Sequence, residues 1–223
     1  MSGQQHGLLA IWHDIEPGAE AAFHDWHSRE HLPERMAVPG FLRARRYEAV
    51  TGGPRYFNDY LVESRDVLTS PAYLERLNAP SSWTSRVVPS FRGVNRSVCR
   101  PVVSAGQGEG GLIATLRFAP EQLCDADGLA AMLPGLADGA AIPAVRLWQG
   151  DAGASLLETA ETKLRAGGTG VAAWVLALEG QFSEDLETAI RDVLARMRAN
   201  GMLEGEPQGA VYRLLMRLEA PGR

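Results

Sequence analysis

Residues 39–63, PGFLRARRYEAVTGGPRYFNDYLVE, carry the clearest structural signal in the sequence, because their pattern predicts two strands joined by a tight turn. Pro39 and Gly40 favour a stop before the first strand, which we place at Phe41–Val50. The second strand, Arg55–Glu63, is rich in aromatic and β-branched residues. Between the two strands, TGGP is typical of a turn. We therefore predict an antiparallel hairpin in the first half of the chain.

The segments on either side of this hairpin extend it into a β-α-β-β-α-β unit. Gly7–Ile15 is a short apolar run typical of a strand, and Asp66–Asn78 has the character of a helix. A longer helix is expected over Pro17–Leu32, where apolar residues follow one stripe. Its end is expected there because Pro33 disfavours helical geometry at the residue before it. A fourth strand near Ser97–Val103 completes the unit.

The second half repeats this order after the Gly-rich linker Ser104–Gly111. The expected elements are strands at Leu112–Phe118, Ile142–Gln149, Val171–Glu179 and Val211–Glu219, helices at Pro120–Leu133 and Ser183–Met197, and a helical insertion at Ser155–Arg165. The chain is therefore predicted to be two fused ferredoxin-like repeats, residues 1–104 and 105–223, whose antiparallel four-stranded sheets pack face to face. Two independent α+β domains on a flexible linker are the alternative.

The composition is that of an ordinary globular protein, and it argues against several classes of partner. The 223 residues carry a net charge of −5, which gives no electrostatic reason to expect nucleic acid or an anionic membrane. The longest apolar run, Val171–Leu178, is too short to span a bilayer, so no membrane is expected. Cys99 and Cys124 form no paired motif, which predicts neither disulfides nor zinc and favours a reduced, cytoplasmic setting.

The residues that could carry chemistry gather in the first predicted helix. All five histidines lie within the first 31 residues, and the second repeat, which has none, is expected to act as scaffold. At helical spacing Glu30 falls at the centre of the stripe that should face the sheet, where a carboxylate needs a partner such as Arg46 or a histidine. Two interpretations stay open: a structural ion pair that ties helix to strand, or a carboxylate that orients His31 as a general base or acid.

A metal site is the weaker hypothesis for these histidines. His27 and His31 have the i, i+4 spacing that can chelate one ion, but HSREH lacks the glutamate position of the HExxH motif. Only His13 or Glu30 could add a third ligand. The glycine motifs of dinucleotide sites, P-loops and nucleophile elbows are absent from the sequence. We therefore expect no metal ion and no cofactor.

Candidate substrate-binding residues come from the strands and from nearby aromatic side chains. Tyr60 and Asn58 lie on one face of the predicted third strand and suit hydrogen bonding to a carbonyl or phenol. Trp12 and Trp83 could form apolar walls. The full predicted set is His27, Tyr60, Asn58, Arg46, Trp12 and Trp83. Each has an ordinary structural explanation as well: a solvated face for the polar residues and core packing for the tryptophans.

The run WHSREHLP at residues 26–33, with VPGF at 38–41 and RRY at 45–47, resembles the EthD-like branch of the dimeric α/β-barrel superfamily. The resemblance implies a pocket between the sheet and its helices, with His31 as the functional histidine. The superfamily includes cofactor-free isomerases, cyclases, dehydratases, oxygenases and lyases that act on small, often aromatic molecules, and also haem proteins. Many relatives have one repeat per chain, so two fused repeats imply one barrel within a monomer, with a homodimer left open.

These observations together predict a cofactor-independent enzyme that transfers a proton on a small hydrophobic or aromatic carbonyl or phenol compound. The reaction would be that of a lyase, dehydratase or isomerase. His31 would move the proton, and Glu30 would orient it. The alternatives are a non-catalytic small-molecule-binding or stress-response barrel, and a haem- or metal-dependent oxygenase.

Overall fold

The hairpin predicted at residues 39–63 is present, and it belongs to a four-stranded sheet. A computed structural model describes residues 6–137 and 139–220 of the chain. The strands of the first half are β1 (Gly7–Ile15), β2 (Phe41–Gly52), β3 (Tyr56–Val62) and β4 (Phe91–Gly106). Those of the second half are β5 (Leu112–Phe118), β6 (Ala144–Asp151), β7 (Trp174–Gly180) and β8 (Gln208–Glu219). The halves take matching orders, β4-β1-β3-β2 and β8-β5-β7-β6, as in two ferredoxin-like repeats.

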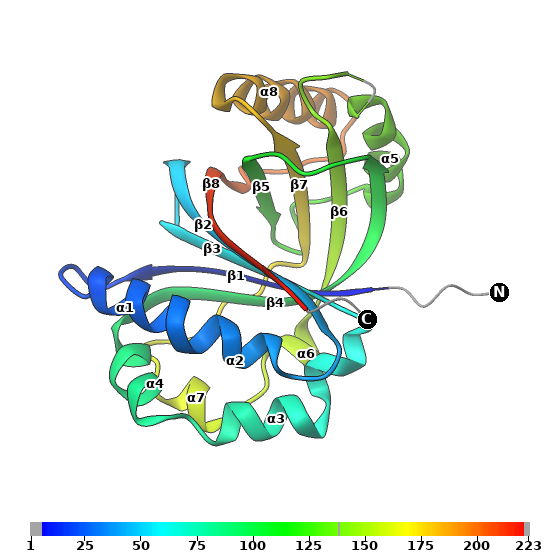
Figure 1. Cartoon of the computed structure of the whole chain (residues 1–223). Helices are drawn as coiled ribbons and strands as arrows, with labels where there is room; N and C mark the ends of the chain where they lie inside the picture. Colours follow the sequence, from blue (N-terminus) through cyan, green and yellow to red (C-terminus); the bar gives the residue numbers. More distant parts are fainter. Residues whose placement is uncertain (1–5, 138, 221–223) are drawn as a thin grey trace.

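The two sheets are joined at their edges as well as facing each other. β2 pairs with β8, and β4 pairs with β6, so the eight antiparallel strands close into one barrel (Figure 1). Closure pairs the backbone N–H and C=O groups that an open sheet leaves unpaired at its edges. The predicted α+β fold of two fused ferredoxin-like repeats in one barrel is therefore confirmed, and the strand pairs that join the two sheets at their edges are added by the structure. β4 also continues through the start of the predicted linker to Gly106.

Alternation along β1 separates the barrel interior from the space under the helices. Leu8, Ala10 and Trp12 belong to the apolar cluster inside the barrel. Leu9 packs in a different cluster, among residues of the helices, and His13 is likewise outside the barrel core. Because successive side chains point to opposite faces of a strand, one face of β1 fills the barrel and the other meets the helix layer.

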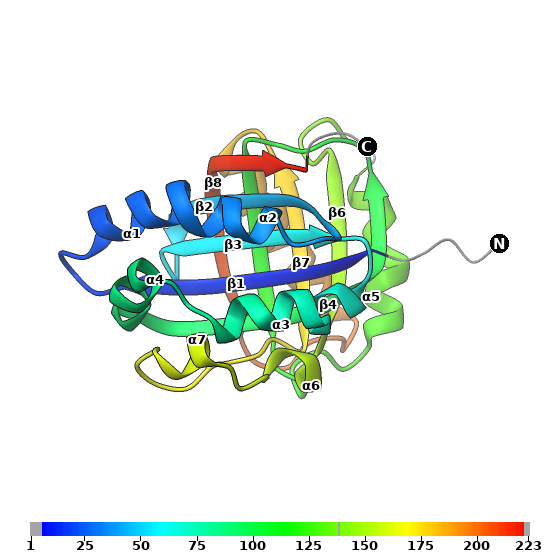
Figure 2. The same cartoon turned by 60° about the horizontal axis from the view of Figure 1, so that its bottom comes forward.

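One layer of helices covers the outer face of the first-half sheet (Figure 2). It contains α1 (Glu20–Trp26), α2 (Leu32–Met36), α3 (Pro71–Asn78) and α4 (Ser82–Val87), with α6 (Ala152–Ser155) and α7 (Ala160–Lys163) from the second half. On the other side of the barrel lie α5 (Ala126–Met132) and α8 (Ser183–Ala199) (Figure 1). Short 3₁₀ turns are at Arg65–Thr69, Val88–Ser90 and Leu133–Leu136. The predicted insertion is thus partly helical, and it packs on the helices of the first half.

The first helix continues past Pro33, where the sequence predicted its end. A π-helical turn, His27–His31, links α1 to α2, and the N–H of Leu32 donates to the carbonyl of His27. Pro33 lies in the first turn of α2, where its missing N–H costs little. Wide turns of this kind are frequent at functional sites, and this one carries a buried histidine at each end. Within the described residues, none of the helices is both long and apolar enough to cross a membrane.

Candidate functional site

A small enclosed cavity lies between the outer face of the first-half sheet and the helix layer. Its volume is about 30 Å³, which is room for a water molecule or two. His27 and His31 reach it from the π-helical turn, and Asn58 and Tyr60 reach it from β3. His13 lines it from the end of β1. The structure therefore brings four of the predicted site residues to one place, between the sheet and its helices.

His27 and His31 are stacked loosely against each other, with ring centroids 5.2 Å apart. Both are buried, and the Nδ1 atom of each has no hydrogen-bond partner in the part of the chain that the structure describes. Burial is the main cause that lowers both pKa values well below the usual range. For His31, the positive charges of Arg35 and Arg165 lower the pKa further. Both rings are therefore neutral near pH 7, and each can accept a proton.

His13 and Asn58 form a hydrogen-bonded pair at the base of the cavity. His13 Nδ1 lies 3.3 Å from the carbonyl of Asp14, which makes Nδ1 the protonated nitrogen. Its Nε2 then accepts from Asn58 Nδ2 at 3.2 Å. Burial lowers the pKa of His13 to about 3, so this ring is also neutral. Asn58 Oδ1 is buried without a partner among the described residues and is free to accept a hydrogen bond.

Aromatic side chains close the remaining walls. The ring of Trp26 lies over His31 at a centroid distance of 4.4 Å, and Phe91 lies 4.3 Å from His13. Tyr60 is buried, and burial raises the pKa of its phenol, which therefore stays protonated and can donate a hydrogen bond. The cavity thus combines neutral proton acceptors, the phenols of Tyr60 and Tyr73 and apolar surface, the composition of a small-molecule site.

Three predicted binding residues lie elsewhere. Trp12 points into the barrel, because it is on the inner face of β1, and its Nε1 donates to Thr115 Oγ1 at 3.1 Å. Trp83 sits on α4, half-buried, with the guanidinium of Arg29 5.8 Å from its ring. Arg46 is buried and donates to a carbonyl of α1 at 3.5 Å. These three side chains therefore do not line the cavity that contains His27 and His31.

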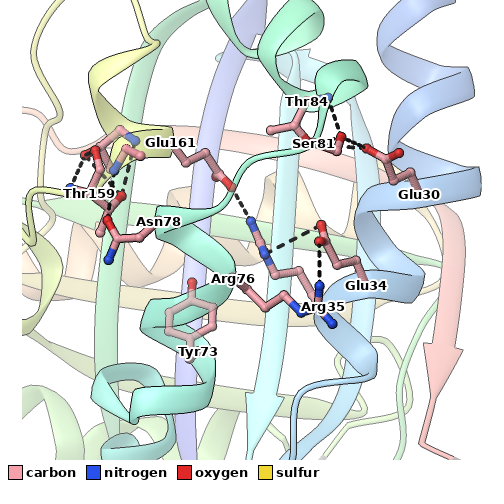
Figure 3. Close-up of polar contacts among 12 residues, drawn as sticks. Glu30, Glu34, Arg35, Tyr73, Arg76, Asn78, Ser81, Thr84, Thr159 and Glu161 are labelled. Atoms are coloured by element: carbon pink, nitrogen blue, oxygen red, sulfur yellow. Dashed lines mark hydrogen bonds and ion pairs between the residues drawn. The ribbon is translucent and has the colours of Figure 1, made fainter.

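Glu30 contacts α4 and not the ring of His31. Its Oε1 accepts from Ser81 Oγ at 2.6 Å and from Thr84 Oγ1 at 3.2 Å (Figure 3). Trp26 Nε1 donates to the same oxygen at 3.1 Å. Ser81 is also the N-cap of α4, whose backbone N–H at Thr84 donates to its hydroxyl. The expected partners, Arg46 or a histidine, are replaced by hydroxyl and indole donors. Glu30 therefore ties the first helix to α4, which is a structural contact.

Sequence reasoning missed a charged group on the far wall of the cavity. Arg35 on α2 forms an ion pair with Glu161 on α7, across 126 positions of the chain (Figure 3). Arg165 lies 3.5 Å from the other oxygen of Glu161. Arg96 of β4 donates to the carbonyl of Ser155 at 2.9 Å. Arg35 was not placed on the first helix from the sequence, because that helix was predicted to end before Pro33. Arg35 nevertheless follows His31 by four positions, the same interval that separates His27 from His31.

The second half of the chain therefore contributes directly to the site. Glu161, Arg165, Thr162 and Leu157 line the cavity together with the first-half residues. No group of three or more histidine, cysteine, aspartate or glutamate side chains within residues 6–137 and 139–220 is arranged to hold a metal ion. The pair His27 and His31 thus has no third metal ligand of these types in that part of the chain.

Comparison with known proteins places the fold. No family model and no curated protein matches the sequence. Among solved structures, an anthrone oxidase-like protein is similar with a TM-score of 0.65 at 12% identity, covering 99% of this chain and 95% of its own. A candidate monooxygenase from Fusobacterium nucleatum subsp. nucleatum has a TM-score of 0.59 at 9% identity, covering 100% and 98%. The chain has the fold of the dimeric α/β-barrel proteins.

A further match names a different chemistry. A haem-binding protein from Thermus thermophilus has a TM-score of 0.54 at 10% identity, covering 95% of this chain and 93% of its own. Because all these identities are low, the likeness extends to the fold and not to the reaction. The function must therefore be argued from the cavity.

Proposed function

We propose that this protein is a cofactor-independent enzyme of the EthD-like branch that transfers a proton on a small hydrophobic or aromatic carbonyl or phenol compound. The observation that supports this most is the pair of buried, neutral imidazoles of His27 and His31, each with an unpartnered Nδ1, in one cavity. An unpaired buried nitrogen costs stability, so its retention favours a functional role. A protein that only bound an apolar ligand would gain nothing from such groups.

In the proposed reaction, His31 removes a proton from the carbon next to a carbonyl. The electron pair of the broken C–H bond moves to the carbonyl oxygen, and the phenol of Tyr60 donates a hydrogen bond to that oxygen. Return of the proton to another carbon gives an isomerase, and loss of a leaving group gives a lyase or dehydratase. His27 stacks beside His31 and fixes its ring, and Asn58 Oδ1 accepts from a hydroxyl of the ligand.

A haem does not fit this cavity. Cofactor and ligand sites are clefts of about 300–1,000 Å³. The cavity of about 30 Å³ would have to grow at the expense of the packed sheet and helices around it. A small ring needs a lesser change, because one wall is the four-residue helix α7. No step of the proposed reaction runs through a haem.

The remaining expectations are part of the same proposal. The repeats at residues 1–104 and 105–223 would form one barrel within each monomer, because β8 and β6 already pair with the edges of the first-half sheet. Association of two such barrels into a homodimer is the alternative. A cytoplasmic location is supported by the free thiols of Cys99 and Cys124.

Hydrogen–deuterium exchange at carbon tests the proposal without knowledge of the product. A panel of aryl ketones and aryl keto acids in D₂O, followed by NMR, should show enzyme-dependent exchange next to the carbonyl. His31→Ala should slow this exchange by about 10²- to 10⁴-fold, the contribution of a positioned base. His24→Gln, on the same helix but outside the cavity lining, is the matched control. No exchange across the panel, or unchanged exchange in folded His31→Ala, would contradict the proposal and favour a binding barrel.

A further inference from the structure

The cavity holds more positive charge than its carboxylate can neutralise. In the described part of the chain, its lining includes the arginines Arg35, Arg96 and Arg165 but a single acidic residue, Glu161. The three lining histidines are neutral for the reasons given above. Glu34, outside the lining, offsets part of the Arg35 charge at 3.9 Å. The remaining positive charge is unfavourable in an empty buried site, because it has lost its water.

The hydrogen bonds show which arginine lacks partners. Arg96 is satisfied by the carbonyls of Ala154 and Ser155, at 3.3 and 2.9 Å. Arg35 donates from one nitrogen to Glu161, and its Nη1 makes no hydrogen bond among the described residues but lies 3.9 Å from a carboxylate oxygen of Glu34, an ion pair. Arg165 has only a long contact to Glu161, at 3.5 Å, and neither its Nε nor its Nη1 has a partner there.

Arg165 is therefore the unexplained group. Its side chain is 8% exposed, yet it shares one carboxylate with Arg35. Burial lowers the pKa of Arg165, which is the direction expected for a cation held without enough compensation. A structural ion pair would not leave two buried guanidinium nitrogens unpaired, because each unpaired donor costs stability.

We propose that the cavity takes a small apolar or aromatic acid, whose carboxylate pairs with the guanidinium of Arg165. This inference rests on the proposed function and narrows its substrate to carboxylate-bearing compounds. A planar carboxylate matches a guanidinium edge and accepts two parallel N–H bonds, from Nε and one Nη. Arg35 Nη1, which makes no hydrogen bond among the described residues, provides a further donor. Leu9, Ile11 and Leu77 provide the apolar surface for the rest of the molecule.

Access through α7 is consistent with this placement. The helix has four residues, and it is held by the Glu161 ion pairs and by Asn78 Oδ1, which accepts from the N–H of Ala160 at 3.0 Å. An incoming carboxylate replaces Glu161 as the partner of Arg165, so the charge of Arg165 stays balanced when the Glu161 contact opens. The bound anion also offsets the two arginine charges beside His31, which makes His31 a stronger base when the substrate is present.

Calorimetric titration with benzoate and benzamide tests this inference. The two probes have nearly the same shape and differ in charge. Benzoate should bind the wild-type protein at least about tenfold more tightly than benzamide, because only benzoate forms a charge-assisted pair with Arg165. Arg165→Gln should remove that preference, and Arg86→Gln, an exposed arginine on α4, should retain it.

The outcomes separate this inference from the proposed function. Equal affinity for the two probes, no binding of either, or an unchanged preference in Arg165→Gln would overturn the inference, and would mean that water alone satisfies the free guanidinium nitrogens. If Arg165→Gln does not fold, Arg165→Lys is used to test the inference. A lysine ammonium cannot make two parallel N–H bonds to a carboxylate, so this variant should bind benzoate more weakly than the wild type. Binding is read without turnover. Carboxylate preference without carbon exchange would therefore sustain this inference while the proton-transfer function failed.

Discussion

Acidification from pH 8 to pH 5 should destabilise the protein, and His13 offers a direct measure of the effect. Burial lowers the pKa of His13 to about 3, whereas a histidine in an unfolded chain has a pKa of about 6.5. Because the folded pKa is the lower one, the unfolded chain binds the proton first as the pH falls. The stabilisation is therefore complete above about pH 6.5 and is lost progressively as the pH falls towards about 3.

The magnitude follows from these two pKa values. At pH 5 the unfolded histidine is almost fully protonated and the folded one is neutral, which lowers the free energy of unfolding by about 2 kcal/mol relative to pH 8. His27 and His31 act in the same direction, because burial lowers their pKa values as well. Total stabilities are typically about 5–15 kcal/mol, so a loss of about 2 kcal/mol from His13 alone is large enough to measure at pH 5.

The assay is urea denaturation of the wild type and of His13→Phe at both pH values. Phenylalanine keeps an aromatic ring beside Phe23 and Phe91, which lie 5.2 and 4.3 Å from the ring of His13. Between pH 8 and pH 5, the free energy of unfolding of His13→Phe should decrease by about 2 kcal/mol less than that of the wild type, whatever the absolute stability of the variant. His6→Gln, at an exposed histidine, should follow the wild type. Equal losses in wild type and His13→Phe would refute the reasoning.

Three further predictions concern residues placed by the structure. Glu30→Ala should lower the free energy of unfolding by about 1–3 kcal/mol, because it leaves the hydroxyl donors at α4 unpaired. The rate of hydrogen–deuterium exchange at the substrate carbon should change less than about twofold, and a large loss of that exchange would mean that Glu30 acts in catalysis. Trp12→Phe should cost about 1–3 kcal/mol in the same urea assay and leave benzoate affinity unchanged, since its indole bonds inside the barrel. Residues 1–104 alone should aggregate or self-dimerise in sedimentation experiments, because β2 and the part of β4 within the fragment lose their partner strands. A stable monomer of this fragment would mean that the repeats are separate domains.

The order of the elements could be obtained from the sequence because it depends on local patterns. Apolar runs bounded by proline and glycine placed the strands at Gly7–Ile15 and Leu112–Phe118 within a residue of where they lie. The same patterns failed at Pro33, because the π-helical turn before it begins a new helical segment that tolerates proline. A wide turn has no signature in residue spacing.

The candidate site could be predicted only in part, for a related reason. Helical periodicity placed His27 within the buried stripe of the first helix and His31 at its edge, and both are buried. Strand periodicity placed Asn58 and Tyr60 on one face of β3. The same periodicity could not say which face of β1 enters the barrel, so it left open whether Trp12 packs in the core, where it lies, or beside the histidines.

What the sequence determined by itself is the repeated β-α-β-β-α-β order, the gathering of histidines in the first helix and the pairing of β2 with β3. What only the tertiary structure decided is which charges share the cavity. Glu161 and Arg165 lie in an insertion of the second half, and barrel closure carries that insertion over the helices of the first half, where Glu161 meets Arg35. Periodicity reports contacts within a helix or between neighbouring strands, whereas a contact across 126 positions depends on how the whole barrel closes.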